Sequence, residues 1–385
     1  MTVLLTTHLI GDLNRSRVLQ AFCDHGPLSR AEVARLAGVP RATIGTIVQN
    51  LLDAGLLEEL EPDRDGRVGK PGRPLWFGPD AGLSVAVGFA ADRVRAALVN
   101  ARGDRLAETS VRLDTPRATT TALTAAVVEA AREVLPDTGE VLGVGIVIPG
   151  IADTAAGEVI GSGQLPGAVG TELATTVSAQ LGLPVLLDND ARAQALGEKW
   201  FGDARGVPTF ASVHTGDGLG VGLVLDGHVY RGGDGRAGEL GHTAVVLDGD
   251  PCRCGLSGCW ETVATLPWLR AQAKALGLPK AARMTTGALV ALGTEGRPLL
   301  DRYLDHVAAG LANLVNLLGT TRIVLHGDLV EGGEEVRAAV EAATQARVLG
   351  HLRADVQVTF SALDADAALL GAAGLVLSET FRLAV

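Results

Sequence analysis

Three of the chain's four cysteines, Cys252, Cys254 and Cys259, lie in one short segment that follows His242, in the pattern His-x9-Cys-x-Cys-x4-Cys. Three thiolates and an imidazole form a donor set that zinc binds tetrahedrally, and a site with four protein ligands is typically structural. A redox dithiol usually has Cys-x-x-Cys spacing, which is absent from this segment. We therefore predict one structural zinc ion per chain, which would tie residues 242–259 into a rigid loop. Three reduced, buried thiols without a metal are the alternative.

Two glutamates flank the predicted zinc loop. Glu239 lies three positions before His242, and Glu261 lies two positions after Cys259. Ionised carboxylates accept hydrogen bonds and donate none, so a pair fixed by a metal-tied loop suits the neighbouring hydroxyl groups of a ligand. Solvated surface glutamates are the ordinary alternative, because single glutamates are mostly exposed.

Helix signals follow one another closely in the first 77 residues, where nine basic and nine acidic side chains balance. Ser29 and Glu32 form a capping box that opens a short helix, and Gly38 ends it. Pro40 starts a further helix. Two short helices joined by a glycine-containing turn predict a helix-turn-helix.

The second of these helices leaves polar side chains for a partner, and the segment after it predicts a β-wing. Such side chains contact base edges and phosphates in the major groove. Two short apolar strands flank a basic tip, which can reach phosphates or an adjacent minor groove. The candidate DNA-binding residues are Arg41, Thr43, Thr46, Gln49, Asn50, Arg67, Lys70 and Arg73. A helical hairpin used for dimerisation, with a solvated basic loop, is the alternative.

From about residue 80 the pattern changes to strands that alternate with helices. Apolar runs predict strands at 83–89, 94–99, 141–148, 185–187, 210–213, 221–225 and 322–325. Helical patterns occupy 120–134 and 191–200. Strands and helices in this order are typical of an α/β fold, here one of two lobes.

A polar segment, Asp188-Asn189-Asp190, stands between a predicted buried strand and a helix. In an open α/β sheet, ligands bind beyond the carboxyl ends of the strands. A carboxylate there acts as a general base or accepts a hydrogen bond from a hydroxyl. An ordinary helix cap is the alternative. The glycine-rich segment 215–222 matches a phosphate-binding loop, although glycines also mark tight hairpins.

Charge and hydropathy exclude several classes of protein. The net charge of −11 argues against a protein that coats nucleic acid regardless of sequence. No run of about 18 apolar residues offers a membrane span, and the first residues lack the basic and apolar regions of a signal peptide. We expect a soluble, cytoplasmic protein with no membrane partner.

In their order and spacing these motifs resemble the ROK family of repressors, open reading frames and sugar kinases. The resemblance covers about residues 80–385, and the N-terminal helix-turn-helix is similar to that of the family's transcriptional branch. The motifs that carry it are Ile148-Pro-Gly150, Leu187-Asp-Asn-Asp-Ala191, Ala195-Leu-Gly-Glu198, the glycine-rich segment, Ala237-Gly-Glu-Leu-Gly-His242, and the cysteine segment through Glu261-Thr-Val-Ala264.

The resemblance implies a winged helix-turn-helix over residues 1–78 and an actin-like, two-lobed sugar-kinase fold over 79–385. Lobe one would contain about 79–190 and the C-terminal helix, and lobe two about 191–360. A sugar would bind in a cleft between the lobes, and one ring nitrogen of His242 would face it while the other binds zinc. The implied sugar-binding residues are Asn189, Asp190, Glu239, His242, Glu261 and Gln164, the last at a position where family members usually carry Asn.

Departures from the kinase pattern decide between the family's branches. Family kinases carry an Asp-x-Gly-x-Thr motif on their first strand, where this chain has Ala86 at the Asp position. Asp217 replaces a Thr of the glycine-rich segment, and His326-Gly-Asp-Leu329 departs from the family's adenosine loop. Phosphoryl transfer depends on positioned magnesium and phosphates. We therefore expect neither ATP nor magnesium to bind, and no catalysis.

Together these observations predict a sugar-responsive regulator, a repressor of carbohydrate metabolism or transport genes. It would bind operator DNA as a homodimer or homotetramer, with a sugar or sugar phosphate as effector. An ATP-dependent sugar kinase of the same family, with Asp190 as its base, is the first alternative. A regulator that has lost its sugar and answers to a protein partner is the second.

Overall fold

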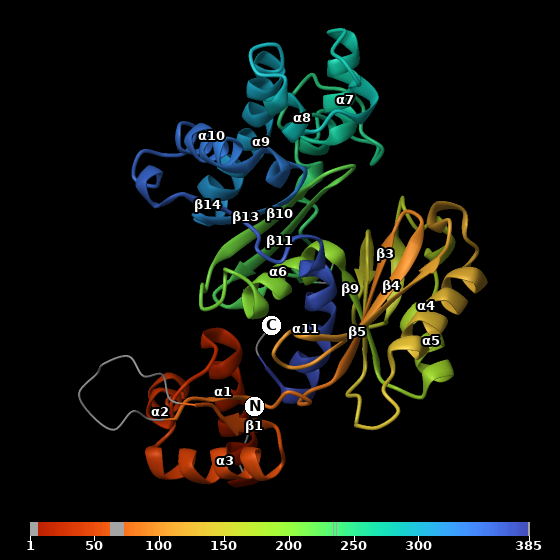
Figure 1. Ribbon diagram of the computed structural model, residues 1–385. Helices are drawn as coiled ribbons and strands as arrows, with labels where there is room; N and C mark the ends of the chain where they lie inside the picture. Colours follow the sequence, from red (N-terminus) through yellow and green to blue (C-terminus); the bar gives the residue numbers. More distant parts are fainter. Residues whose placement is uncertain (1–6, 62–72, 234, 236, 384–385) are drawn as a thin grey trace. The chain divides into compact units, whose positions relative to one another are not determined.

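The computed structural model describes residues 7–61, 73–233, 235 and 237–383 (Figure 1). The chain falls into two compact units. Of the described residues, the first unit contains 7–61, 73–189, 199–201 and 369–383, and the second contains 190–198, 202–233, 235 and 237–368. Among the described residues, no helix combines the length and the apolar character that crossing a membrane requires.

A winged helix-turn-helix forms the N-terminal part of the first unit, as predicted. In the capping box, the hydroxyl of Ser29 accepts a hydrogen bond from the amide of Glu32 at 3.4 Å, and the Glu32 carboxylate accepts one from the Ser29 amide at 2.9 Å. Gly38 ends the second helix with φ at 64°, a left-handed conformation that favours glycine. The elements are α1 (Thr7–His25), α2 (Arg30–Ala37), α3 (Arg41–Asp53), β1 (Leu57–Glu59) and β2 (Leu75–Phe77).

A five-stranded sheet, in the order β5-β4-β3-β6-β9, makes up most of the rest of the first unit. The first three strands pair antiparallel and the last three pair parallel. Helix α11 lies so close to β6 that a Cβ on Gly145 would stand 2.0 Å from the carbonyl oxygen of Ala372. The elements are β3 (Ser84–Ala90), β4 (Arg93–Val99), β5 (Arg105–Arg112), α4 (Thr120–Val134), β6 (Val144–Ile148), β7 (Ile151–Asp153), β8 (Glu158–Gly161), α5 (Leu173–Leu181), β9 (Val185–Asn189) and α11 (Ala367–Phe381).

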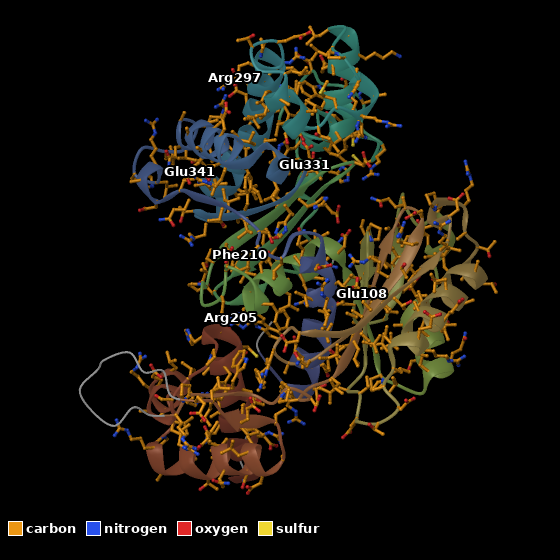
Figure 2. All side chains as sticks on the ribbon, viewed as in Figure 1. Glu108, Arg205, Phe210, Arg297, Glu331 and Glu341 are labelled. Atoms are coloured by element: carbon orange, nitrogen blue, oxygen red, sulfur yellow. The ribbon has the colours of Figure 1, made fainter. Side chains whose placement is uncertain are left out.

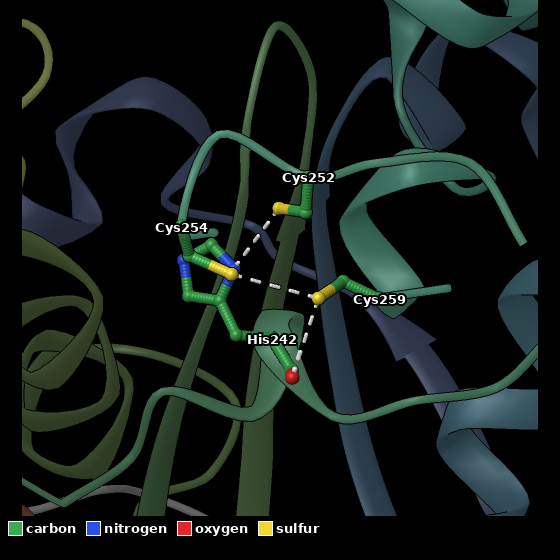
Figure 3. A group of neighbouring side chains, drawn as sticks. All are labelled: His242, Cys252, Cys254 and Cys259. Carbon is green, nitrogen blue, oxygen red and sulfur yellow. Dashed lines mark hydrogen bonds between the residues drawn. The ribbon is translucent and has the colours of Figure 1, made fainter. Parts of the chain in front are cut away.

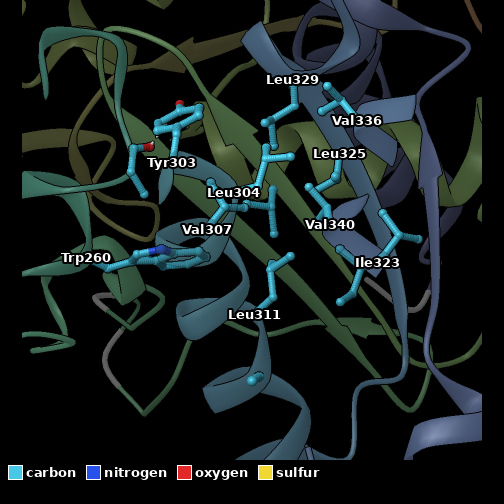
Figure 4. Packing of buried hydrophobic residues seen from close by; sticks show 14 of the residues in the cluster. Trp260, Tyr303, Leu304, Val307, Leu311, Ile323, Leu325, Leu329, Val336 and Val340 are labelled. Carbon is cyan, nitrogen blue, oxygen red and sulfur yellow. Dashed lines mark hydrogen bonds between the residues drawn. The ribbon is translucent and has the colours of Figure 1, made fainter. Parts of the chain in front are cut away.

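The second unit repeats this topology, with a sheet in the order β12-β11-β10-β13-β14. Three strands again pair antiparallel and three pair parallel. Helix α9 packs Tyr303, Val307 and Leu311 into the core that β13 lines with Ile323 and Leu325 (Figure 4). Two such units make the actin-like α/β fold that the sequence predicts. The elements are α6 (Asp190–Phe201), β10 (Phe210–Thr215), β11 (Leu219–Leu225), β12 (His228–Val229), α7 (Leu266–Ala275), α8 (Thr286–Ala291), α9 (Arg297–Leu318), β13 (Arg322–Gly327), α10 (Gly333–Gln345) and β14 (Gln357–Phe360).

Several elements were not predicted, and most are short or half-exposed. Strand β5 alternates exposed and half-buried positions. Its Glu108, labelled in Figure 2, pairs with Arg95 of β4 at 2.5 Å. Such a strand lacks the apolar run on which the prediction relied. Strands β7, β8, β12 and β14 have four residues or fewer, too few to establish a period.

Gly310→Ala should lower the free energy of unfolding, although alanine ordinarily favours a helix over glycine by about 1 kcal/mol. A Cβ at Gly310 in α9 would lie 2.0 Å from Cε2 of the buried Trp260. Such overpacking costs about 1–3 kcal/mol, which urea unfolding would measure. Gly45→Ala in α3 is the control, because no atom lies within 4 Å of a Cβ added there. Equal gains in stability from both substitutions would contradict the packing seen at Trp260.

Candidate functional site

The predicted zinc ligands converge in the second unit (Figure 3). The Sγ of Cys252 lies 3.5 Å from Nδ1 of His242, and the Sγ atoms of Cys254 and Cys259 lie 3.7 Å apart. One ligand atom from each of the four residues lies within 4.8 Å of all the others. Ligands that share one zinc at about 2.0–2.3 Å stand about 3–4 Å from each other. The donor set and its spacing therefore fit a zinc ion.

Tight turns bring these side chains together. The amide of Cys252 donates to the carbonyl of Leu256 at 2.7 Å, and Gly258 has φ at 71°. A Cβ on Gly258 would collide with the carbonyl oxygen of Val246, from which it would stand 1.7 Å. Burial raises the pKa of the Cys259 thiol to about 12, so this thiol keeps its proton until a cation displaces it.

Both flanking glutamates face His242. Oε2 of Glu261 lies 3.4 Å from Nδ1 of the imidazole, and Oε2 of Glu239 lies 4.0 Å from Nε2. The two ring nitrogens thus face different groups: Nδ1 faces Cys252 and Glu261, and Nε2 faces Glu239. The short 3-10 helix that carries Glu261 (Trp260–Thr262) is anchored by Trp260, whose Nε1 donates to the carbonyl of His306 at 3.0 Å.

Arg253 was not predicted as a site residue. Its guanidinium donates to Oε1 of Glu261 at 2.6 Å, and the Glu261 side chain is only 11% exposed. Since Arg253 stands between Cys252 and Cys254 in the sequence, the segment that carries the predicted zinc ligands also places a cation on this carboxylate. The signal in the sequence was a basic residue inside the Cys-x-Cys motif.

Asp190 is the first residue of α6, directly after β9. Its carboxylate accepts a hydrogen bond from the amide of Ala191 at 2.8 Å. Burial raises the pKa of Asp190 to about 7, and the negative charge of Glu239 adds to this effect. A carboxyl with such a pKa exchanges a proton near neutral pH, which suits it to contact a hydroxyl group.

The remaining predicted sugar residues belong to the first unit. β9 extends to Asn189, two residues beyond the predicted strand, so Asp188 and Asn189 lie in the strand and Asp190 begins the helix. The side-chain amide of Asn189 donates to the carbonyl of Gly150 at 2.8 Å. Gln164 is exposed, in a bend between β8 and α5.

Positions at which the sequence departs from the kinase pattern lie on β3 and in the turn between β10 and β11. Strand β3 carries no carboxylate, and Ala86 is fully buried in its middle. The single hydroxyl of this strand, on Ser84, is buried and donates to the carbonyl of Val99 at 3.4 Å. In the glycine-rich turn between β10 and β11, the carboxylate of Asp217 accepts a hydrogen bond from the guanidinium of Arg270 at 2.8 Å. The turn therefore carries an ion pair.

The candidate DNA-binding face is exposed on α3. Ile44, Val48 and Leu51 are buried beneath it. Arg73 is exposed and pairs with Glu59 at 3.3 Å, while Arg67 and Lys70 lie outside the described residues. The predicted residues of α3, all exposed, are Arg41, Thr43, Thr46, Gln49 and Asn50.

Family models match both parts of the chain. The model described as the ROK family matches residues 84–379, and the model described as the MarR family matches residues 12–68. The xylose repressor of Caldicellulosiruptor bescii is 26% identical over 96% of this chain and 97% of its own length. The glucokinase of Thermotoga maritima is 30% identical, over 60% of this chain and 78% of its own. A solved ROK family transcriptional regulator, described as a homologue of the Escherichia coli MLC protein, superposes with a TM-score of 0.77 at 25% identity, covering 97% and 99% of the two chains.

Proposed function

The chain belongs to the ROK family, and from that premise we propose that it is a sugar-responsive DNA-binding regulator that represses carbohydrate genes. The observation that carries the proposal is the combination of a winged helix with an exposed polar recognition face and a kinase-like domain whose first strand has no carboxylate. The similarity to a xylose repressor extends over nearly the full length of both chains. Such a domain suits effector binding, since phosphoryl transfer requires positioned magnesium and phosphates.

The sugar-binding groups of the second unit are Asp190, Glu239, His242 and Glu261. Carboxylates that are fixed in place accept hydrogen bonds from sugar hydroxyls, and Nε2 of His242 adds a further polar contact. Asn189 and Gln164, which belong to the first unit, are the other proposed sugar-binding residues, and each offers a side-chain amide. Zinc, when bound, fixes the ring of His242 and the loop that carries Arg253. Its role is to shape the site.

The operator-binding groups are the five exposed residues of α3 and the basic wing. In a homodimer or homotetramer, two recognition helices would meet half-sites about one helical turn apart.

Arg41→Ala should weaken DNA binding by about tenfold and reduce the salt dependence of the DNA affinity by about one phosphate contact. A mobility-shift titration at several salt concentrations, on the DNA upstream of the chain's own gene, measures both. Arg283→Ala, an exposed charge of the second unit, is the control and should leave both unchanged. Absence of retardation by the unsubstituted chain at moderate salt would contradict the proposal.

A sugar kinase is the second candidate, favoured by Asp190, whose pKa of about 7 suits a general base. A coupled assay of ADP release across common hexoses distinguishes the two functions. We expect no release above background, because β3 offers no carboxylate for magnesium. Turnover at an ordinary enzymatic rate, about 1 per second or faster, would establish the kinase instead.

A further inference from the structure

Helix α6 connects the proposed sugar site to the DNA-binding domain. It begins at Asp190 and ends at Phe201. Its residues 190–198 belong to the second unit and its residues 199–201 to the first. In the last turn, Nζ of Lys199 lies 3.1 Å from Oδ1 of Asp24. Asp24 lies near the end of α1, in the winged helix.

The Lys199 side chain is only 5% exposed and that of Asp24 28%. Lysine is among the residues least often buried, unless it is paired. Removing one partner of a buried pair leaves the other charge uncompensated, so such a pair resists separation. Asp24 is also held within α1, since its Oδ1 accepts from Nε2 of Gln20 at 2.9 Å. The pair therefore fastens α1 to the end of α6.

The winged helix has other attachments in the first unit. Arg102, in the turn between β4 and β5, donates to the carbonyl of Phe77 and to Glu58, both at 2.6 Å. The hydroxyl of Ser16 donates to the carbonyl of Phe381 at 2.9 Å. Breaking the Lys199–Asp24 pair therefore leaves the domain attached. Arg102, unlike Lys199, does not sit on a helix that begins at a proposed sugar residue.

We propose that Lys199 is the positioning residue through which sugar binding alters DNA affinity. The inference rests on the proposed function. A sugar that contacts Asp190 acts on the first turn of α6, and an α-helix of 12 residues transmits a displacement along its axis as one rigid body of about 18 Å. Lys199 passes that displacement to α1 through Asp24. A ligand shifts the equilibrium between two conformations only as far as it binds one of them better than the other. The Lys199–Asp24 ion pair must therefore stay formed for sugar binding and DNA binding to be coupled.

The test compares Lys199→Met, Asp24→Asn and Arg102→Gln with the unsubstituted chain. The DNA is a duplex selected from a random pool by the unsubstituted chain, and the probes are D-xylose and D-glucose. Three quantities are measured: DNA affinity with and without sugar, the sugar-induced rise in unfolding temperature, and amide hydrogen exchange in residues 7–25. Asp24→Asn serves as the milder substitution, because Asp24 is partly exposed.

We expect Lys199→Met and Asp24→Asn to keep sugar binding and DNA binding but to lose their coupling. For two typical allosterically coupled sites, sugar changes the DNA affinity by about tenfold. In these two variants, sugar should change the DNA affinity by less than about twofold. Exchange in residues 7–25 should be faster without any sugar. Arg102→Gln should keep the ratio of DNA affinities with and without sugar that the unsubstituted chain has. A ratio or an exchange rate that both substitutions at the pair leave unchanged would overturn the inference and leave the proposed function standing. A different outcome is that neither sugar changes the DNA affinity of the unsubstituted chain, while amide exchange in residues 7–25 is faster in the Lys199→Met chain. That outcome would count against the proposed function for these sugars and against the role of the pair in transmission.

Discussion

Cys254→Ser should yield a chain without bound metal that still binds DNA but has lost its response to sugar. A serine hydroxyl does not replace a thiolate ligand of zinc, and four protein ligands are needed to close a structural site. Cys254 is exposed, so the substitution disturbs little packing. Without the metal, the ring of His242 and the loop that carries Arg253 lose their fixed orientation. We expect sugar binding to weaken about 10- to 100-fold, the range by which affinity or activity falls when a residue that orients a metal ligand is substituted.

Elemental analysis of protein purified without chelator, together with calorimetric sugar titration, measures both effects. Cys23→Ser is the matched control, because Cys23 is buried in α1 and lies outside the cluster. It should keep one zinc per chain and the full sugar response. A Cys254→Ser chain that retains stoichiometric zinc, or an unsubstituted chain that contains none, would contradict the metal assignment.

Asp190→Asn should lower sugar affinity about 100-fold while making the chain more stable at neutral pH. An amide in place of an ionised carboxylate loses a charge-assisted hydrogen bond to a sugar hydroxyl, which is worth about 1.5–3 kcal/mol. Sugar affinity of the unsubstituted chain should also rise between about pH 6 and about pH 8, as the carboxyl with its pKa near 7 ionises. The Asp190→Asn chain should show no such rise.

The gain in stability follows from the direction of the pKa shift. Burial raises the pKa of Asp190 from 3.8 to about 7, so the folded chain holds this proton more tightly than the unfolded chain does. Its ionisation therefore costs stability progressively as the pH rises from about 4 through about 7. Asp190→Asn should add up to about 4 kcal/mol at about pH 8, since each unit of the pKa shift is worth about 1.4 kcal/mol, and less than about 1 kcal/mol at about pH 4. Urea unfolding at the two pH values measures this difference, and Asp226→Asn, on an exposed turn, is the control. Lower stability at both pH values would show that Asp190 serves the fold rather than the ligand.

Local signals made much of this protein predictable from its sequence. The capping box at Ser29 and the end at Gly38 depend on side-chain and backbone chemistry within four residues. The cysteine spacing predicted a cluster that the fold does assemble. The order of apolar strands predicted the α/β fold, although β5, with its exposed alternate positions, was missed.

What escaped prediction depends on contacts between distant segments. Lys199 carries no local signal of its partner Asp24, which lies 175 residues away in the chain. Arg253 and Glu261 are close in sequence, yet their pairing depends on the turns at Gly255 and Gly258. The raised pKa of Asp190 arises from burial and from Glu239, and neither is visible in the Asp-Asn-Asp motif. Periodicity and capping describe one element at a time, so they do not report such neighbours.

Sugar-dependent DNA binding can be measured by a fluorescence anisotropy titration of a labelled, selected duplex with the unsubstituted chain, alone and with saturating sugar. The panel comprises D-xylose, D-glucose and their phosphorylated forms. For a sugar-responsive regulator, we expect at least one of these sugars to change the DNA dissociation constant by about fivefold or more. The Asp190→Asn chain should show no change at the same sugar concentration. A dissociation constant that none of these sugars alters, at protein concentrations where the duplex is fully bound, would contradict a sugar-responsive regulator and favour one that answers to a protein partner.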